Sequence, residues 1–249
     1  NWLARRFPWL AICLYRHPIL CPMAFFLLCW SPFLIAFYPG TVIWDMGEML
    51  GGLYGLRDLS TWHPMFTTWL FGGCVWLGRL LGSDNAGAFL FTLLQTLLMA
   101  YALAQSVRFL RRLGLSPMWR LAALAFFGLS PIFGSFAQAI GKDTLYTAAL
   151  LVFAVSIAEG LRFGGLSRRG LIVCAIAALA SCLVRSNGLY VVIGTAVPVL
   201  LFGFRGKVRL QIGSALLGAV TVALLFSNVL VPALGIKDET ASGLYSVCF

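Results

Sequence analysis

Asp45 is the first carboxylate of the chain and lies in its longest polar-rich segment between apolar runs, 38–63. It follows the turn signal Pro39-Gly40 by five residues, and Glu48 lies three residues further along. A carboxylate in such a place can deprotonate an acceptor hydroxyl or hold a divalent cation. A solvated loop acid or a helix N-cap residue would look the same in the sequence. The spacing alone favours one of these two simpler interpretations.

His63 is a second candidate, because it opens the apolar run 64–82 together with Pro64. Its ring could contact a phosphate or transfer a proton. A histidine that only caps the following helix fits the sequence equally well. Trp44 and Trp62 could stack on a sugar face, although tryptophans beside apolar runs belong more often to the aromatic belt of a membrane protein.

A very short polar connection, 138–144, contains Lys142 and Asp143 between two apolar runs. The two side chains must lie at the membrane boundary, because the flanking runs leave little chain between them. They could neutralise each other at little energetic value. Alternatively, Lys142 holds an anionic head group and Asp143 joins Asp45 in one site.

The next such connection reads Arg185-Ser186-Asn187-Gly188. Its Asn-Gly pair predicts a tight turn with positive φ angles. A guanidinium at this depth is usually paired or functional, and its fork suits a phosphate. Snorkelling toward lipid head groups is the simpler interpretation. We treat Arg185 and Asn187 as candidate substrate-binding residues.

Composition identifies the elements that must position these residues. Of the 249 residues, 61% are apolar and 10% are charged, against about 45–50% and about 25% in soluble domains. Disordered, collagen-like and ordinary cytosolic chains are excluded, and the net charge of +10 accompanies no nucleic-acid-binding pattern. We expect an all-α membrane protein with about seven transmembrane helices in a single domain, 1–249. The predicted spans are 18–37, 86–107, 117–138, 144–160, 170–185, 188–204 and 210–233.

The distribution of Lys and Arg decides whether the run 64–82 also crosses the membrane. If it does not cross, 13 of the 18 basic residues lie inside with a cytoplasmic N-terminus; if it does, only 7 lie inside. The positive-inside rule favours the first arrangement. We therefore predict that 64–82 is an interfacial helix of an outer loop, 38–85, with a re-entrant hairpin as the alternative. Seven of the eight acids then lie on the outer side.

The seven cysteines form no CxxC pair and have no histidine at metal-ligand spacing, so we assign them no chemistry. The chain begins with Asn1 and ends in a polar stretch, 237–249. We expect a longer protein that continues with a further C-terminal part.

Four short motifs resemble those of the GT-C glycosyltransferases, a superfamily of membrane enzymes. The motifs are Tyr-Pro-Gly followed by Trp-Asp at 38–45, Trp-His-Pro at 62–64, Gly-Lys-Asp at 141–143 and Arg-Ser-Asn-Gly at 185–188. The order of a first span, an acidic outer loop, an interfacial helix and further spans is also similar. The His-Pro start of 64–82 is similar to that of the interfacial helix in protein mannosyltransferases and aminoarabinose transferases.

The resemblance implies inverting transfer of a sugar from a polyprenyl-phosphate donor to a cell-envelope acceptor, at the outer face of a bacterial plasma membrane. It implies a catalytic base at Asp45, a second acidic position at Asp143, and phosphate contacts from Lys142 and Arg185. We add His63 to the catalytic candidates. No Asp-x-Asp pair stands at 45, so a divalent cation held by the two aspartates is left open. The further candidate substrate-binding residues are Trp44, Glu48, Trp62 and Asn187.

Two other functions compete with the enzyme hypothesis. A transporter or flippase for a lipid-linked precursor usually has polar residues near the membrane midplane, and here only Gln95 is a clear case. A non-catalytic lipid-binding subunit of an envelope complex predicts that Asp45 and Asp143 lie far apart. None of the three hypotheses involves a nucleic-acid partner.

Overall fold

The computed structural model describes residues 14–56, 58–59, 61 and 63–236. Trp62, one of the candidate residues, lies outside this range. The bounds are α3 Leu20–Ala36, β1 Thr41–Val42, α4 Trp44–Leu53, α5 Met65–Leu80, α6 Asp84–Arg112, α7 Pro117–Leu129, α8 Pro131–Gln138, β2 Ala139–Ile140, α9 Lys142–Phe163, α10 Arg168–Val184, α11 Ser186–Pro198, a π-helical extension Val199–Gly203, α12 Gly206–Leu225, a second π-helical segment Phe226–Leu230, and α13 Val231–Ala233.

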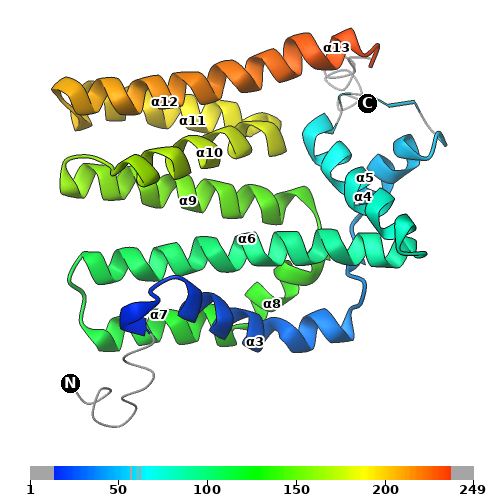
Figure 1. Cartoon of the computed structure of the whole chain (residues 1–249), viewed down its shortest axis with the longest axis horizontal. Coiled ribbons are helices and arrows are strands. Elements are labelled where there is room, and N and C mark those ends of the chain that lie inside the picture. The colour runs from blue at the N-terminus through cyan, green and yellow to red at the C-terminus, as the bar shows by residue number, and fades with distance from the viewer. Residues whose placement is uncertain (1–13, 57, 60, 62, 237–249) are drawn as a thin grey trace, which may run out of the picture.

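The long helices run side by side, and successive ones alternate in direction (Figure 1). Each predicted span corresponds to one helix or to two or three consecutive helical segments. Within the described residues, four helical stretches are long and apolar enough to cross a membrane: Asp84–Arg112, Lys142–Phe163, Ser186–Gly203 and Gly206–Ala233. A fifth results if α7 and α8, bent by 49°, count as one span, and α3 is a shorter apolar helix. The protein is therefore an all-α, multipass membrane protein.

Local sequence explains where the helices begin and end. The Ser83 side chain accepts a hydrogen bond from the Ala86 amide at the start of α6, and Ser167 caps α10 in the same way. Gly164 ends α9 in the left-handed conformation that glycine adopts at little cost. In Figure 1, α9 ends and α10 begins at one end of the bundle, whereas α6 begins at the other end.

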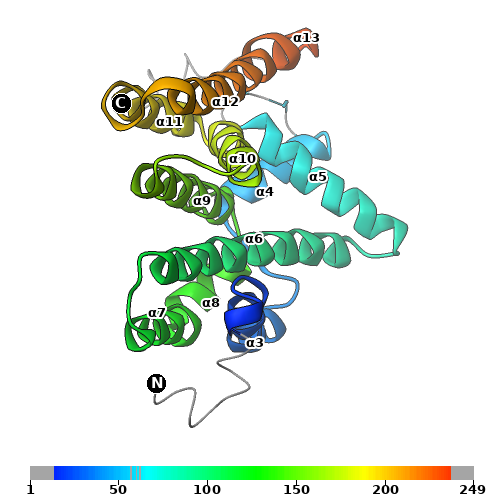
Figure 2. The ribbon, with the colours of Figure 1, turned by 60° about the vertical axis from the view of Figure 1, so that its left-hand side comes forward.

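Helices α4 and α5 lie together at the other end of the bundle, and α5 runs obliquely across the ends of the long helices (Figures 1 and 2). Helix α5 packs on α6 through a very close contact, since a Cβ on Gly78 would overlap the backbone of Gly87. Its Thr67 is buried and donates a hydrogen bond to the Val184 carbonyl at the end of α10, at 3.4 Å. The oblique direction suits an interfacial helix, whose position relative to a membrane remains a prediction.

The turn between α10 and α11 differs from the predicted one. No residue of Arg185-Ser186-Asn187-Gly188 has a positive φ, and α11 begins directly at Ser186. The expectation of a positive-φ Asn-Gly turn was therefore wrong. Gly188 is needed for another reason: a Cβ there would overlap the carbonyl of Ser181, so only glycine lets α11 pack this closely on α10.

Candidate active site

Two very short strands place two helix starts next to each other. Strand β1 pairs in parallel with β2, with Thr41 opposite Ala139 and Val42 opposite Ile140. Helix α4 begins two residues after β1, and α9 begins two residues after β2. The matched register therefore puts Asp45, in the first turn of α4, beside the first turn of α9, which contains Asp143.

Buried polar side chains hold this arrangement in place. The fully buried Gln95 of α6 donates to the carbonyls of Ala137 and Ala139, at 3.0 and 2.7 Å, and accepts from the Gly141 amide at 3.4 Å. Gln138 accepts hydrogen bonds from both the amide and the hydroxyl of Thr41. Gln95 thus satisfies the backbone groups that are left free where α8 gives way to β2 and α9.

Lys142 lies at the centre of a chain of polar contacts. Its Nζ is 2.6 Å from Oδ2 of Asp45 and 3.1 Å from Nδ1 of His63. His63 Nε2 is in turn 3.3 Å from Oε2 of Glu48, so the contacts run Asp45–Lys142–His63–Glu48. With Lys142 donating to Nδ1, the neutral ring carries its proton on Nε2 and donates it to Glu48.

A second ion pair, between Arg185 and Asp143, adjoins this chain. The Arg185 guanidinium lies 5.8 Å from the centre of the Tyr146 ring. The positive charge of Arg185 acts on Asp45 as well as on its direct partner. The site therefore joins residues from α4, the segment before α5, the start of α9 and the turn between α10 and α11.

Electrostatics favour an ionised Asp45 in this state. The hydrogen bond from Lys142 lowers the pKa of the Asp45 carboxyl below its ordinary value, while partial burial opposes the shift. The positive charges of Lys142 and Arg185 lower this pKa further, as does that of His63 when its ring is protonated. A carboxylate held in this way is a weak base until Lys142 moves away.

Helix ends add positive potential to the same place. Helices α4, α9 and α11 begin at Trp44, Lys142 and Ser186, next to the residues of the two ion pairs. Helix N-termini present free amides and carry a partial positive charge, which favours an anion. The arrangement can therefore accept an anionic group close to Lys142 and Arg185. The Asp45 carboxylate is available beside it for an uncharged group.

The other candidate residues lie at the margin of the site or outside it. Trp44 is 80% exposed beside Asp45. Asn187 is exposed in the first turn of α11. Asp45 and Asp143 each have a basic partner, and among the described residues no group of three or more His, Cys, Asp and Glu side chains is placed to hold a metal ion.

Sequence reasoning did not identify the positioning roles of Thr67, Gln95 and Gln138. The sequence offered one signal for such a role, an amide side chain in the middle of an apolar run, and this side chain is Gln95. Thr67 and Gln138 gave no such signal, because their carbonyl and hydroxyl partners are distant in the sequence.

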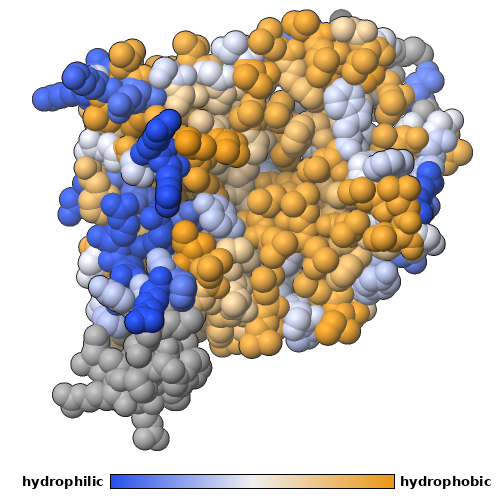
Figure 3. All heavy atoms as spheres, in the orientation of Figure 1, coloured by the Kyte–Doolittle hydropathy of each residue, from blue (hydrophilic) through white to orange (hydrophobic). Residues whose placement is uncertain are grey.

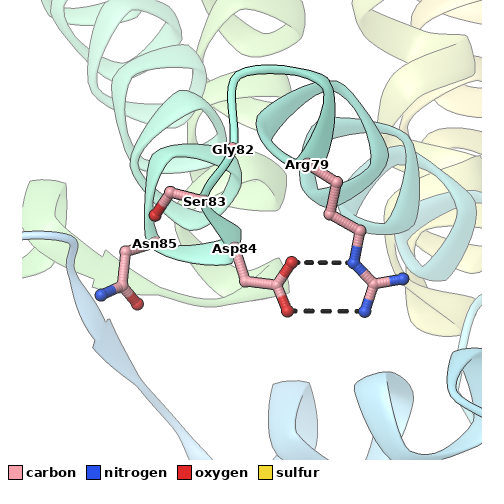
Figure 4. Close-up of a pocket in the computed structure, with 5 residues that line it drawn as sticks. All are labelled: Arg79, Gly82, Ser83, Asp84 and Asn85. Carbon is pink, nitrogen blue, oxygen red and sulfur yellow. Dashed lines mark hydrogen bonds and ion pairs between the residues drawn. The ribbon is translucent and has the colours of Figure 1, made fainter.

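A separate polar cluster lies at the tip of the α5–α6 hairpin. Arg79 forms two hydrogen bonds with Asp84, which also accepts one from the Tyr54 hydroxyl at 3.0 Å. The residues Arg79, Gly82, Ser83, Asp84 and Asn85 line an open depression of about 510 Å³ (Figure 4). None of these residues is among the candidates, and the cluster connects the end of α4 to the hairpin.

Comparison with known proteins identifies a family but no activity. No curated protein and no solved structure matches the chain. A family profile described as a family of unknown function, DUF6020, matches residues 57–242. This stretch covers α5 to α13 and includes His63, Lys142, Asp143 and Arg185. The chain belongs to the DUF6020 family.

Proposed function

We propose that the protein is a membrane glycosyltransferase of the GT-C type, which transfers a sugar from a polyprenyl-phosphate donor to a cell-envelope acceptor. The observation that carries this proposal is the position of Lys142, which contacts both Asp45 and His63 while Arg185 lies close by. A carboxylate and two fixed cations at the end of an apolar bundle suit a substrate that combines a phosphate with a long lipid tail.

In the proposed mechanism, the donor phosphate exchanges partners with the site. The phosphate oxygens accept hydrogen bonds from Lys142 and Arg185, in place of those that Asp45 and Asp143 accept in the unliganded state. Loss of the Lys142 hydrogen bond raises the pKa of Asp45 toward its ordinary value. Asp45 thus becomes a better base only when the donor is bound, which limits reaction without substrate.

The transfer step is a direct displacement. The acceptor hydroxyl attacks the anomeric carbon of the sugar and gives its proton to Asp45. The bond between that carbon and the phosphate oxygen breaks, and its electron pair leaves with polyprenyl phosphate. Lys142 and Arg185 stabilise the charge that develops on the departing phosphate. His63 holds Lys142 in place, and Glu48 orients the His63 ring.

The proposed membrane arrangement has seven spans and an interfacial helix. It assigns spans to α3, the α7–α8 pair and α10 in addition to the four long stretches, and lays α5 along the outer surface. The N-terminus is then cytoplasmic and the site faces outward in a bacterial plasma membrane. The alternating directions of the helices and the oblique course of α5 support this arrangement (Figure 1).

The test is donor cleavage by the purified full chain in liposomes. Synthetic polyprenyl phosphates that carry radiolabelled hexoses, pentoses or aminosugars are offered together with an envelope extract as acceptor. We expect release of polyprenyl phosphate, a loss of about 100-fold or more in Asp45→Asn, and a higher KM for the donor in Lys142→Gln. Asp84→Asn is the matched control, because Asp84 also pairs with a basic residue but lies in the hairpin cluster.

Two results would contradict the proposal. Asp45→Asn with full activity would remove Asp45 as the base. Movement of intact donor across the bilayer, without cleavage of any donor in the panel, would indicate a flippase instead.

A further inference from the structure

The end of the bundle opposite the candidate site is strongly basic. Hydrophilic side chains gather there, on the left of Figure 3, beside a broad hydrophobic surface. The described basic residues of this end are Arg16, Arg108, Arg111, Arg112, Arg120, Arg162, Arg168, Arg169, Arg205, Lys207 and Arg209, and Glu159 is the one described carboxylate among them.

Glu159 is already occupied by two of these residues. Its side chain is 8% exposed and pairs with Arg108, at 2.7 Å, and with Arg112. Arg108 is held further by Gln105 at 2.7 Å. Because Glu159 is shared by these two arginines, no described carboxylate at this end is free to pair with the other basic residues.

Arg111, in the last turn of α6, and Arg120, near the start of the adjoining α7, have no carboxylate partner among the described residues. Arg111 Nη1 donates to the carbonyls of Leu14 and Tyr15, both at 3.1 Å, and its guanidinium lies 4.6 Å from the centre of the Tyr15 ring. The positive charge of Arg111 also acts on Arg120, so the two groups repel each other. The preceding residues 1–13 contain no Asp or Glu in their sequence.

The Nε atom of Arg120 is buried and has no hydrogen-bond partner in the part of the chain that the structure describes. A buried donor without a partner loses its hydration and gains nothing in return. A guanidinium with an unmet donor, under the influence of a second positive charge, favours an anion near its remaining N–H groups.

We propose that Arg111 and Arg120 bind the phosphodiester group of an anionic phospholipid in the inner leaflet. The two guanidinium groups supply the donors that a phosphodiester needs, and the lipid supplies the missing charge. A lipid is favoured over free phosphate because Met118 and Trp119, next to Arg120 in the first turns of α7, are 80% and 68% exposed and offer an apolar surface to acyl chains. The proposal does not depend on the proposed transferase activity, but its inner leaflet rests on the proposed cytoplasmic N-terminus.

The first experiment uses the unmodified full chain. The protein is reconstituted in phosphatidylcholine nanodiscs with a trace of phosphatidylglycerol that carries a photoreactive group near its head. We expect adducts mainly on peptides covering 14–20 and 111–121. Adducts concentrated on 168–172 or 205–209, or equal labelling by a photoreactive phosphatidylcholine, would overturn the proposal.

The second experiment measures retained phosphatidylglycerol by native mass spectrometry. We expect Arg120→Gln to lower its apparent affinity about tenfold, the typical effect of losing one charge-assisted hydrogen bond. Arg169→Gln, which removes an exposed charge from the same end, is the matched control and should change the affinity less than twofold. Equal losses in both variants would overturn the proposal, as would displacement of the lipid by millimolar inorganic phosphate.

Discussion

Replacing Gly188 by alanine tests how closely α11 must pack on α10. The added Cβ would overlap the carbonyl oxygen and carbon of Ser181 and lie 3.2 Å from the amide nitrogen of Cys182. These are backbone atoms, which cannot rotate away, so the helices must separate. Arg185, which lies only three residues before Gly188, would move with α11. Its ion pair with Asp143 would then be disturbed.

The expected cost follows from two opposing effects. Overpacking of a close contact costs about 1–3 kcal/mol, and the better helix propensity of alanine returns up to about 1 kcal/mol. We therefore expect Gly188→Ala to lower stability by about 1–2 kcal/mol. For a chain of this size that corresponds to a Tm lower by about 2–8 °C.

Gly194 provides the matched control, because it lies in the same helix and a Cβ there would meet no atom within 4 Å. Gly194→Ala should leave Tm unchanged or raise it. Both variants are compared with the unmodified protein in the same detergent at one scan rate, since unfolding of such proteins is often irreversible. A Gly188→Ala variant as stable as Gly194→Ala would refute the close approach of α11 to α10.

The remaining predictions concern buried polar groups and pH. Glu159→Gln should destabilise the protein by about 1–3 kcal/mol, because Arg108 and Arg112, whose side chains are 27% and 44% exposed, lose their charged partner; Asp84→Asn, which breaks an exposed pair, should leave Tm within the error of the same scan, and equal losses would contradict this. Gln95→Leu should cost at least about 2 kcal/mol, since the Ala139 carbonyl and the Gly141 amide lose the partner that Gln95 gives them, while the Ala137 carbonyl keeps Thr96; an unchanged Tm would show that other groups satisfy them. The lowered pKa of Asp45 stabilises the folded state above about pH 4, its unfolded pKa, and this contribution disappears as the pH falls through the lower folded value. The Tm difference between the unmodified protein and Lys142→Gln should therefore shrink as the pH is lowered from 6 to 3. The change should be small, because the Asp45 side chain is 39% exposed. A difference that grows would contradict the assigned contact between Lys142 and Asp45.

The chain's own pattern was enough to predict the long helices, but not α4 in the predicted loop or the break between α7 and α8 in 117–138. Apolar runs near 20 residues must form helices if they cross a bilayer, because hydrocarbon offers no partner for free backbone groups. Pro and Gly signals and the short polar connections marked the ends of the runs, and each predicted span corresponds to helical structure. The residue types of Asp45, His63, Lys142 and Arg185 also indicated one polar end, since all precede or follow apolar runs.

Only the tertiary structure decided which of these residues meet. The Lys142–Asp45 contact depends on a parallel pair of two-residue strands, which are too short to leave a periodic pattern in the sequence. The same limit explains the wrong turn expected at Gly188, where a close helix contact, and not a positive φ, requires glycine. A sequence specifies helices through local periodicity, whereas contacts between distant segments depend on how those helices pack.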